Sequence, residues 1–239
     1  MQAVFGASDD DAKRMAVADL PDPGHAGGLL HLALLGVDAR RLPSGETVLV
    51  VQGEHADRDG DRQSSHADGG LLSIYLLRQE SGKWTVLRRH ENVAAMGSFG
   101  QIGATRWVRT PAGRQLLAVV HGGMWGGFEN EVLSLFDPAA PSVHDLTGHG
   151  VKIHAANDGA CESDARPDLC WNTSAAWRFE RAAGKAEYDN LVLKFSGESG
   201  KAAVPPATRQ MRKVGGTARY VFEQGKYVLR SGTNPVPDI

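Results

Sequence analysis

The stretch "SGETVLVVQGEHADR", residues 44–58, contains the pattern that predicts the fold. It reads as a glycine turn, an apolar strand and a Val-Val-x-Gly ending. The stretch "AGRQLLAVVHGGMWG", residues 112–126, repeats this order. A strand that ends in a basic residue precedes each copy, and a polar loop and another apolar strand follow it. The repeat predicts units of four antiparallel strands with a period of roughly 60–70 residues.

Short runs rich in leucine and β-branched residues, separated by Gly, Pro, Asn and Asp, extend the strand-and-turn pattern along the chain. We expect strands at Leu30–Arg40, Thr47–Gln52, Leu71–Arg78, Trp84–Arg89, Ala104–Arg109, Gln115–His121, Glu131–Phe136, Ala175–Phe179, Leu191–Phe195, Arg219–Glu223 and Lys226–Arg230. The run Asp9–Leu20, "DDDAKRMAVADL", is expected to form one short N-terminal helix, with acidic residues in its first turn and Pro21 as its stop.

The fold class expected from this pattern is all-β. Tandem four-stranded meanders are the building units of propellers, so we expect a propeller-like arrangement or a strongly curved open sheet. Residues 1–239 would form a single all-β domain, with blade-like repeats at roughly 28–92, 102–147 and 150–239. The run "TVLVVQGEHADRDGD" resembles the blade motif of integrin-like propellers, in which a strand leads into an aspartate-rich calcium loop.

Length and charge restrict the classes of partner. A chain of 239 residues is long enough to bury a sizeable core. Its formal net charge of -2 shows no electrostatic footprint for nucleic acid or for an anionic membrane. No apolar run approaches the roughly 18 residues that a membrane span needs. The first residues lack the pattern of a signal peptide, so either the protein is cytosolic or this numbering begins after a removed leader.

The two cysteines favour the second alternative. Cys161 and Cys170 flank the hydrophilic segment "ESDARPD", and such a pair, without further ligand pairs nearby, suits a disulfide better than zinc. A bond that closes about ten residues contributes roughly 2–3 kcal/mol and persists in the periplasm or outside the cell. The alternative is two unrelated buried thiols. We expect the disulfide and a periplasmic or otherwise exported protein.

The polar run "ADRDGDRQSSHADGG", residues 56–70, is a candidate calcium loop. Alternate carboxylates in a tight loop can converge on one cation, and Gly60 permits the turn. The candidate ligands are Asp57, Asp59, Asp61 and Asp68. The alternative is an ordinary charged loop, in which nearby basic side chains neutralise the carboxylates and no calcium binds.

Motifs for catalysis are sparse. The chain contains no phosphate-binding loop, no dinucleotide fingerprint and no Gly-x-Ser-x-Gly at a strand-to-helix turn. The run "HDLTGHGVKIH" spaces His144, His149 and His154 by five residues each, and three imidazoles with an open fourth position would suit catalytic zinc. No general base accompanies them. We therefore expect a protein that is not an enzyme, with no catalytic residues.

The segment "GGMWGGFENE" is the strongest candidate for recognition. It sets Trp125 and Phe128 among four glycines and next to Glu129 and Glu131. Large aromatic side chains in a surface loop are typical of interface hot spots. The alternative is that both rings fold back and cap the sheet. We expect these four residues to form a loop that binds a partner.

The segments "IYLLRQESGKWTVLRRHENV" and "LAVVHGGMWGGFENEVLSLFD" resemble exported proteins of Gram-negative bacteria, some of which are immunity proteins encoded beside secreted antibacterial toxins. The resemblance implies a periplasmic, non-catalytic binding protein. Its loops at 55–70, 121–131 and 161–170 would occlude the active site of a partner toxin or hydrolase. The alternatives are an exported metal-dependent hydrolase and a module that binds carbohydrate or the cell envelope.

Overall fold

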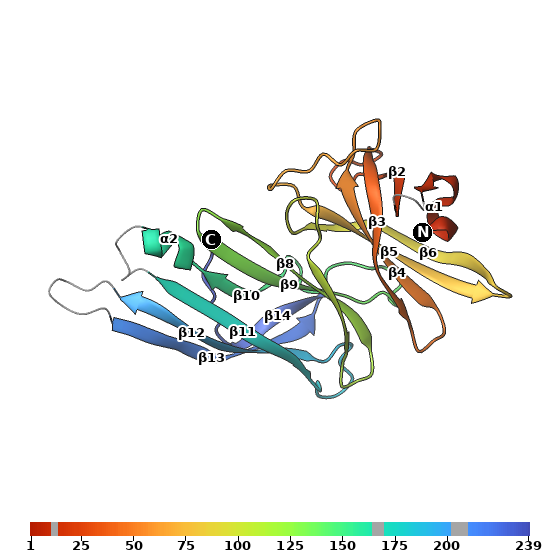
Figure 1. Ribbon diagram of the computed structural model, residues 1–239. Helices are drawn as coiled ribbons and strands as arrows, with labels where there is room; N and C mark the ends of the chain where they lie inside the picture. The colour runs from red at the N-terminus through yellow and green to blue at the C-terminus, as the bar shows by residue number, and fades with distance from the viewer. Residues whose placement is uncertain (11–13, 164–169, 202–209) are drawn as a thin grey trace. The chain divides into compact units, whose positions relative to one another are not determined.

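The computed structural model describes residues 1–10, 14–163, 170–201 and 210–239. It contains two antiparallel sheets, one of six strands and one of eight, and little helix (Figure 1). In both sheets, strands that are consecutive in the chain are neighbours in space. The all-β class expected from the sequence is confirmed, and each expected strand lies within an observed one.

The first sheet has the order β1-β2-β3-β4-β5-β6. Its strands are β1 (Asp9–Asp10), β2 (Met15–Pro21), β3 (Leu29–Arg41), β4 (Thr47–His55), β5 (Gly70–Glu80) and β6 (Lys83–Met96). The first eight residues of β5 are all buried, which is why this strand reads as a continuous apolar run rather than an alternating one. The core on this sheet includes Leu32, Leu34, Val51 and Tyr75.

The second sheet has the order β14-β13-β12-β11-β10-β9-β8-β7. Its strands are β7 (Ala104–Arg109), β8 (Gln115–Trp125), β9 (Phe128–Phe136), β10 (Val151–Ala156), β11 (Trp171–Glu180), β12 (Asn190–Lys201), β13 (Gln210–Glu223) and β14 (Lys226–Gly232). Its core contains Leu116, Leu133, Leu193 and Phe195.

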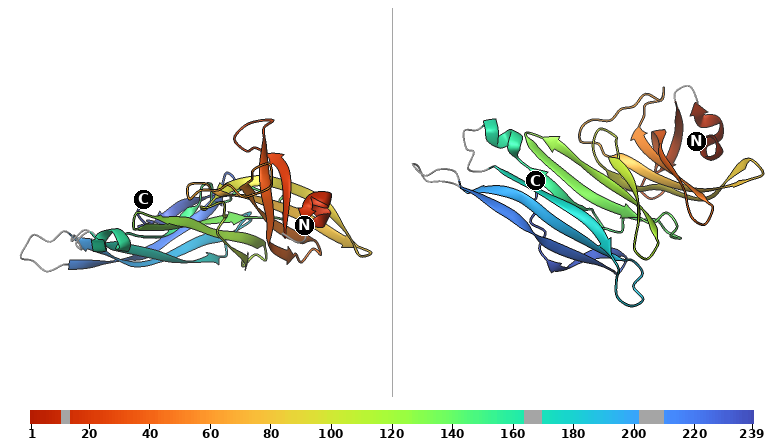
Figure 2. Two further views of the ribbon diagram at one scale, coloured as in Figure 1. Left: turned by 45° about the horizontal axis from the view of Figure 1, so that its top comes forward. Right: turned by 60° about the horizontal axis from the view of Figure 1, so that its bottom comes forward.

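Neither sheet closes or curls strongly, so the expectation of a propeller-like or strongly curved sheet is wrong. Strand pairing continues across the expected repeat boundaries. Strand β2 pairs with β3 through Ala16 and Leu34, which adds strands before the first expected repeat. Strand β9 pairs with β10 through Leu133 and Val151, which joins the second expected repeat to the third. Figure 2 shows the strands within each sheet side by side in this order.

The helix expected at Asp9–Leu20 is also wrong. Residues 11–13 of that run lie outside the described residues, and Met15–Pro21 forms strand β2. Ala16 and Leu20 of this strand are buried. Pairing with β3 therefore outweighs the local helix signals of the run. The short N-terminal helix that the structure does contain is α1 (Gln2–Phe5), followed by the 3-10 turn Gly6–Ser8.

The chain divides into two compact units. Unit 1 comprises residues 1–106 and 136–145, and unit 2 comprises residues 107–135 and 146–239. The core around Tyr75 lies in unit 1 and the core around Phe195 lies in unit 2. In the described residues, no helix has both the length and the apolar character needed to cross a membrane.

Candidate functional site

The recognition segment of unit 2 is a tight hairpin. Strand β8 runs to Trp125 and β9 begins at Phe128, so only Gly126 and Gly127 connect them. Their φ angles are 58° and 82°, which is the left-handed backbone that two-residue hairpin turns need and that glycine adopts without steric cost. The loop expected at 121–131 is therefore mostly strand, and only this two-residue turn lies outside β8 and β9.

Two large apolar side chains project into solvent at the end of this hairpin. In the described part of the chain, Trp125 and Met124 are the most exposed large hydrophobic residues, at 77% and 73% of their accessible surface. Phe128, on the other side of the turn, is partly buried. The exposure of Trp125 does not fit a ring that folds back and caps the sheet. Met124, which the sequence prediction omitted, stands beside it.

Helix α2 (Asp158–Ser163) packs on the hairpin turn. The backbone N–H of Ala160 donates a hydrogen bond of 3.2 Å to the carbonyl oxygen of Gly127. The approach is close: a Cβ atom placed on Gly127 would lie 2.3 Å from the nitrogen of Ala160. Two features therefore require glycine at position 127: the positive φ angle and the close approach of α2.

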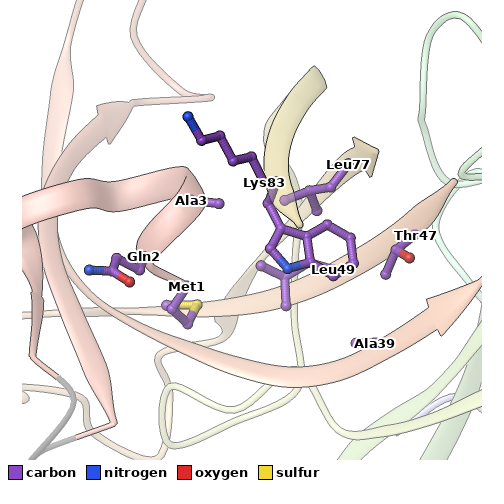
Figure 3. Close-up of a pocket in the computed structure, with 9 residues that line it drawn as sticks. Met1, Gln2, Ala3, Ala39, Thr47, Leu49, Leu77 and Lys83 are labelled. Atoms are coloured by element: carbon purple, nitrogen blue, oxygen red, sulfur yellow. The ribbon is translucent and has the colours of Figure 1, made fainter. Parts of the chain in front are cut away.

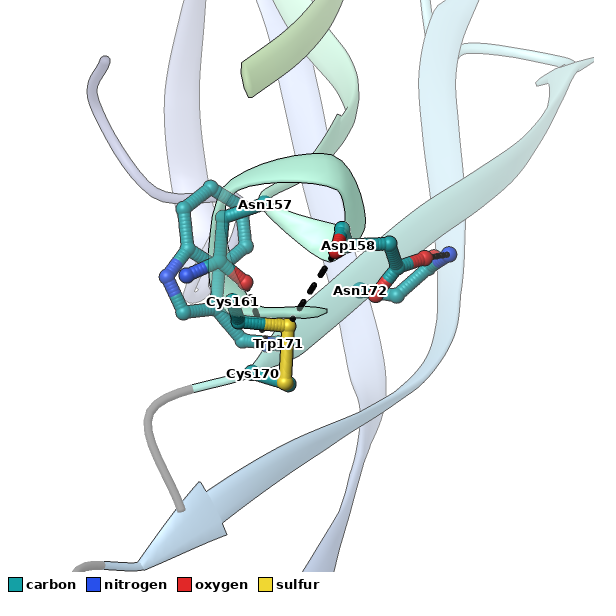
Figure 4. Close-up of a disulfide and its surroundings, with 6 residues drawn as sticks. All are labelled: Asn157, Asp158, Cys161, Cys170, Trp171 and Asn172. Atoms are coloured by element: carbon teal, nitrogen blue, oxygen red, sulfur yellow. Dashed lines mark hydrogen bonds between the residues drawn. A yellow bond between two sulfur atoms is a disulfide. The ribbon is translucent and has the colours of Figure 1, made fainter. Parts of the chain in front are cut away.

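A disulfide fixes α2 in turn. Cys161 and Cys170 are bonded, with their Cα atoms 5.3 Å apart (Figure 4), so the expected pairing is confirmed. The rest of the expected loop, residues 164–169, lies outside the described residues. Two side chains at the start of the helix add polar contacts to β11. Asn157 Oδ1 accepts from the N–H of Trp171 at 2.7 Å, and Asp158 Oδ2 accepts from Asn172 at 3.2 Å.

The two glutamates of the predicted loop lie on β9 beside β10. Glu129 Oε2 is 3.9 Å from His154 Nε2, and Glu131 is the register partner of His154. His154 also contacts the hydroxyl of Ser174 through Nδ1 at 2.8 Å. Glu129 and Glu131 are partly buried. They flank the exposed tip as strand residues rather than forming part of it.

The candidate metal ligands are placed as follows. His144 is an exposed residue of unit 1, whereas His149 and His154 belong to unit 2. Among the residues that the structure describes, no three His, Cys, Asp or Glu side chains are grouped so that they could hold a metal ion. The three histidines and the four aspartates of the polar loop are among these described residues.

The carboxylates of the polar loop in unit 1 accept hydrogen bonds from the loop itself. Asp57 Oδ1 accepts from the backbone N–H groups of Asp59 and Asp61, and its Oδ2 accepts from Gln63. Asp68 Oδ2 accepts from the N–H and the hydroxyl of Ser65. These bonds hold the pKa of Asp57 and Asp68 below the usual value. The donors in these bonds are backbone N–H groups and neutral side chains of the loop. Calcium binding stays a prediction.

No family model matches the sequence, and no curated protein or solved structure matches it either. Function is therefore inferred from the arrangement of the described residues. The feature of unit 2 that most needs a functional explanation is an exposed pair, Trp125 and Met124, on a turn held by α2 and its disulfide. The sequence signal that could have included Met124 is its place between a glycine pair and Trp125.

Proposed function

We propose that the protein is a non-catalytic binding protein whose β8–β9 tip contacts another protein. The observation that carries the proposal is the exposure of Trp125 and Met124 on a two-residue turn. A large exposed aromatic and an exposed methionine are the residue types enriched at protein interfaces. Phe128, Glu129 and Glu131 flank this pair and would form the edge of the interface.

The geometry lowers the entropic cost of association. An aromatic side chain of this size buries roughly 150–250 Å² on binding. At about 25 cal/mol per Å², this area is worth several kcal/mol before the costs of association. The hydrogen bond from Ala160 to Gly127 restrains the turn, and the disulfide restrains α2 beside it. A tip that is already ordered loses less entropy when it binds.

The sharpest form of the proposal is an immunity or inhibitor role. A narrow hairpin tip that carries two large side chains is suited to enter a concave active site, and it would occlude a partner toxin or hydrolase there. The resemblance of the segments around β5–β6 and β8–β9 to exported proteins of Gram-negative bacteria, some of which are immunity proteins, supports this form. The disulfide suits an oxidising compartment, which supports a periplasmic or otherwise exported location.

Site-specific crosslinking in the native compartment tests the proposal. A photo-reactive residue replaces Met124 in one variant and Leu229, an exposed residue on β14 of the same unit, in the control. We expect a discrete protein adduct with the residue at 124 and none with the residue at 229. Equal adducts at both positions, or none at 124 in the native extract, would contradict the proposal.

A further inference from the structure

A cavity of about 570 Å³ lies in unit 1, between the N-terminal residues and one face of the first sheet (Figure 3). Its lining comes from α1 and the residue before it, and from β3, β4, β5 and β6. The residues are Met1, Gln2, Ala3, Ala39, Thr47, Leu49, Leu77, Lys83 and Trp84. Its volume lies within the roughly 300–1,000 Å³ of small-molecule pockets.

The wall of this cavity formed by α1 is fixed to the sheet. Val4 of α1 is buried, and the ring of Phe5 meets that of Tyr75 edge-on with centroids 5.4 Å apart. The guanidinium of Arg89 donates to the carbonyl oxygen of Val4 at 2.8 Å. Because Val4 and Phe5 hold α1 in place, the cavity beside residues 1–3 has a stable wall.

The floor of the cavity is one apolar face of the sheet. Ala39 pairs with Leu49, and Thr47 pairs with Leu77. Cross-strand partners share a face, as do alternate residues of one strand, so all four side chains point to the same side. Trp84 lines the same cavity while 45% of its surface remains exposed.

The side chain of Lys83 is the one cationic side chain among the described residues that line this cavity. Within the described residues, Lys83 takes part in no ion pair, although two carboxylates lie in the same part of the sheet. Glu46 bonds to the Ser44 hydroxyl at 2.6 Å and to Arg78 at 3.2 Å, and Glu80 lies 3.7 Å from Arg78. Arg78 thus pairs with both carboxylates, and the Lys83 ammonium is available to pair with an anion that enters from solvent.

We propose that this cavity binds a single-chain amphiphile with an anionic headgroup, of the class of medium-chain carboxylates. The alkyl chain lies on Leu49, Leu77 and Trp84, and the headgroup pairs with Lys83. The volume, the apolar floor and the unpaired cation all fit this one class of ligand. The site lies in unit 1, so it goes beyond the binding function proposed for the β8–β9 tip of unit 2.

Calorimetry with decanoate and dodecanoate, both below their micelle concentrations, tests the apolar part. Burial of each methylene raises affinity about fourfold, so dodecanoate should bind roughly 16-fold more tightly than decanoate. An Ala39→Phe variant fills the cavity from an exposed position, and it should abolish the binding heat while its melting temperature stays unchanged. Equal affinity for the two acids, or undiminished binding by Ala39→Phe, would overturn the proposal.

A matched lysine pair tests the headgroup contact. Lys83 follows the turn Ser81-Gly82, and Lys226 follows the turn Gln224-Gly225, with the same left-handed backbone in both. Lys83→Met should weaken dodecanoate about fivefold, as for an exposed ion pair, and leave the neutral dodecanol unaffected. Lys226→Met should change neither.

A bilayer could present the same headgroup chemistry, so vesicles of phosphatidylglycerol form the last arm of the test. The proposal predicts binding of monomeric dodecanoate and no co-sedimentation with these vesicles that depends on Lys83. Vesicle binding without dodecanoate binding would overturn it. So would an equal loss of dodecanoate affinity in Lys83→Met and Lys226→Met.

Discussion

The backbone nitrogen of Ala160 lies 3.2 Å from the carbonyl oxygen of Gly127, and this hydrogen bond joins α2 to the turn beside Trp125. The contact connects a part of the chain held by a disulfide to the most exposed aromatic side chain in the described residues. Support of the tip by α2 is therefore a property that substitutions at the turn can test.

Gly127→Ala should destabilise the protein more than Gly126→Ala. Both residues have positive φ, so each change costs about 1 kcal/mol of backbone strain. Only at Gly127 does the new Cβ meet the backbone of Ala160, whereas at Gly126 nothing lies within 4 Å. Overpacking adds about 1–3 kcal/mol at Gly127. Urea denaturation of the two variants measures the difference, and equal losses would show that α2 does not support the turn.

Replacing both Cys161 and Cys170 with serine should lower the free energy of unfolding by about 2–3 kcal/mol. The bond joins two cysteines whose sequence separation is 9 residues, one in α2 and one directly before β11. Denaturation of the protein produced by an oxidising route, with and without the double change, measures the effect. Two free thiols in the denatured, unreduced protein would contradict both the bond and the exported location that it supports.

Asp189 should make the free energy of unfolding depend on pH in the acidic range. Burial of its carboxylate raises its pKa, but N–H groups of Ala112 at 2.6 Å and Ala182 at 3.2 Å stabilise the charged form, and the net pKa lies below the usual value. A lowered pKa contributes stability above the pKa of the unfolded chain, near 4, and that contribution is lost as pH falls through the folded pKa.

Asp189→Asn should therefore cost about 1–3 kcal/mol at neutral pH, since two part-buried backbone N–H donors lose a charged acceptor. The difference between the wild type and the variant should shrink as pH falls below about 4. Urea unfolding at a series of pH values measures this difference. A gap that stays constant down to pH 2 would show that the charge of Asp189 contributes nothing.

The melting temperature should depend on the Asp57 side chain in the polar loop and should not depend on calcium. Asp57 accepts hydrogen bonds from two backbone N–H groups of its own loop, so Asp57→Ala should lower the melting temperature. Asp59→Ala should have little effect. Millimolar calcium should leave the melting temperature of the wild type unchanged. A rise with calcium that is lost in Asp59→Ala would instead establish a calcium site by mass action on the folded state.

Local patterns predicted the strands well because they record burial and turns along single segments. The runs Leu71–Arg78 and Gln115–His121 are examples. They did not predict that strand pairing continues beyond the expected repeats. The run from Met15 to Pro21 has helix signals, yet pairing with β3 and burial of Ala16 make it a strand.

The candidate sites also combine features that the local sequence predicts with features that depend on long-range contacts. Trp125 was identified from its glycine-rich segment, because such a segment allows a turn at the surface. The contact of Gly127 with Ala160 joins positions 33 residues apart in the printed sequence, and no local pattern reports it. The cavity beside Lys83 also depends on long-range placement, since α1 packs against β6 through Val4 and Arg89.

The affinity of the Trp125→Ala variant for the protein captured at the β8–β9 tip tests the central claim most directly. If Trp125 is an interface anchor, the dissociation constant should rise at least about 30-fold, or about 2 kcal/mol, and the melting temperature should stay unchanged. Phe99→Ala, which removes an exposed aromatic side chain from unit 1, should leave the affinity unchanged. Unchanged affinity of Trp125→Ala, with a melting temperature several degrees lower, would contradict the account and make Trp125 a structural cap.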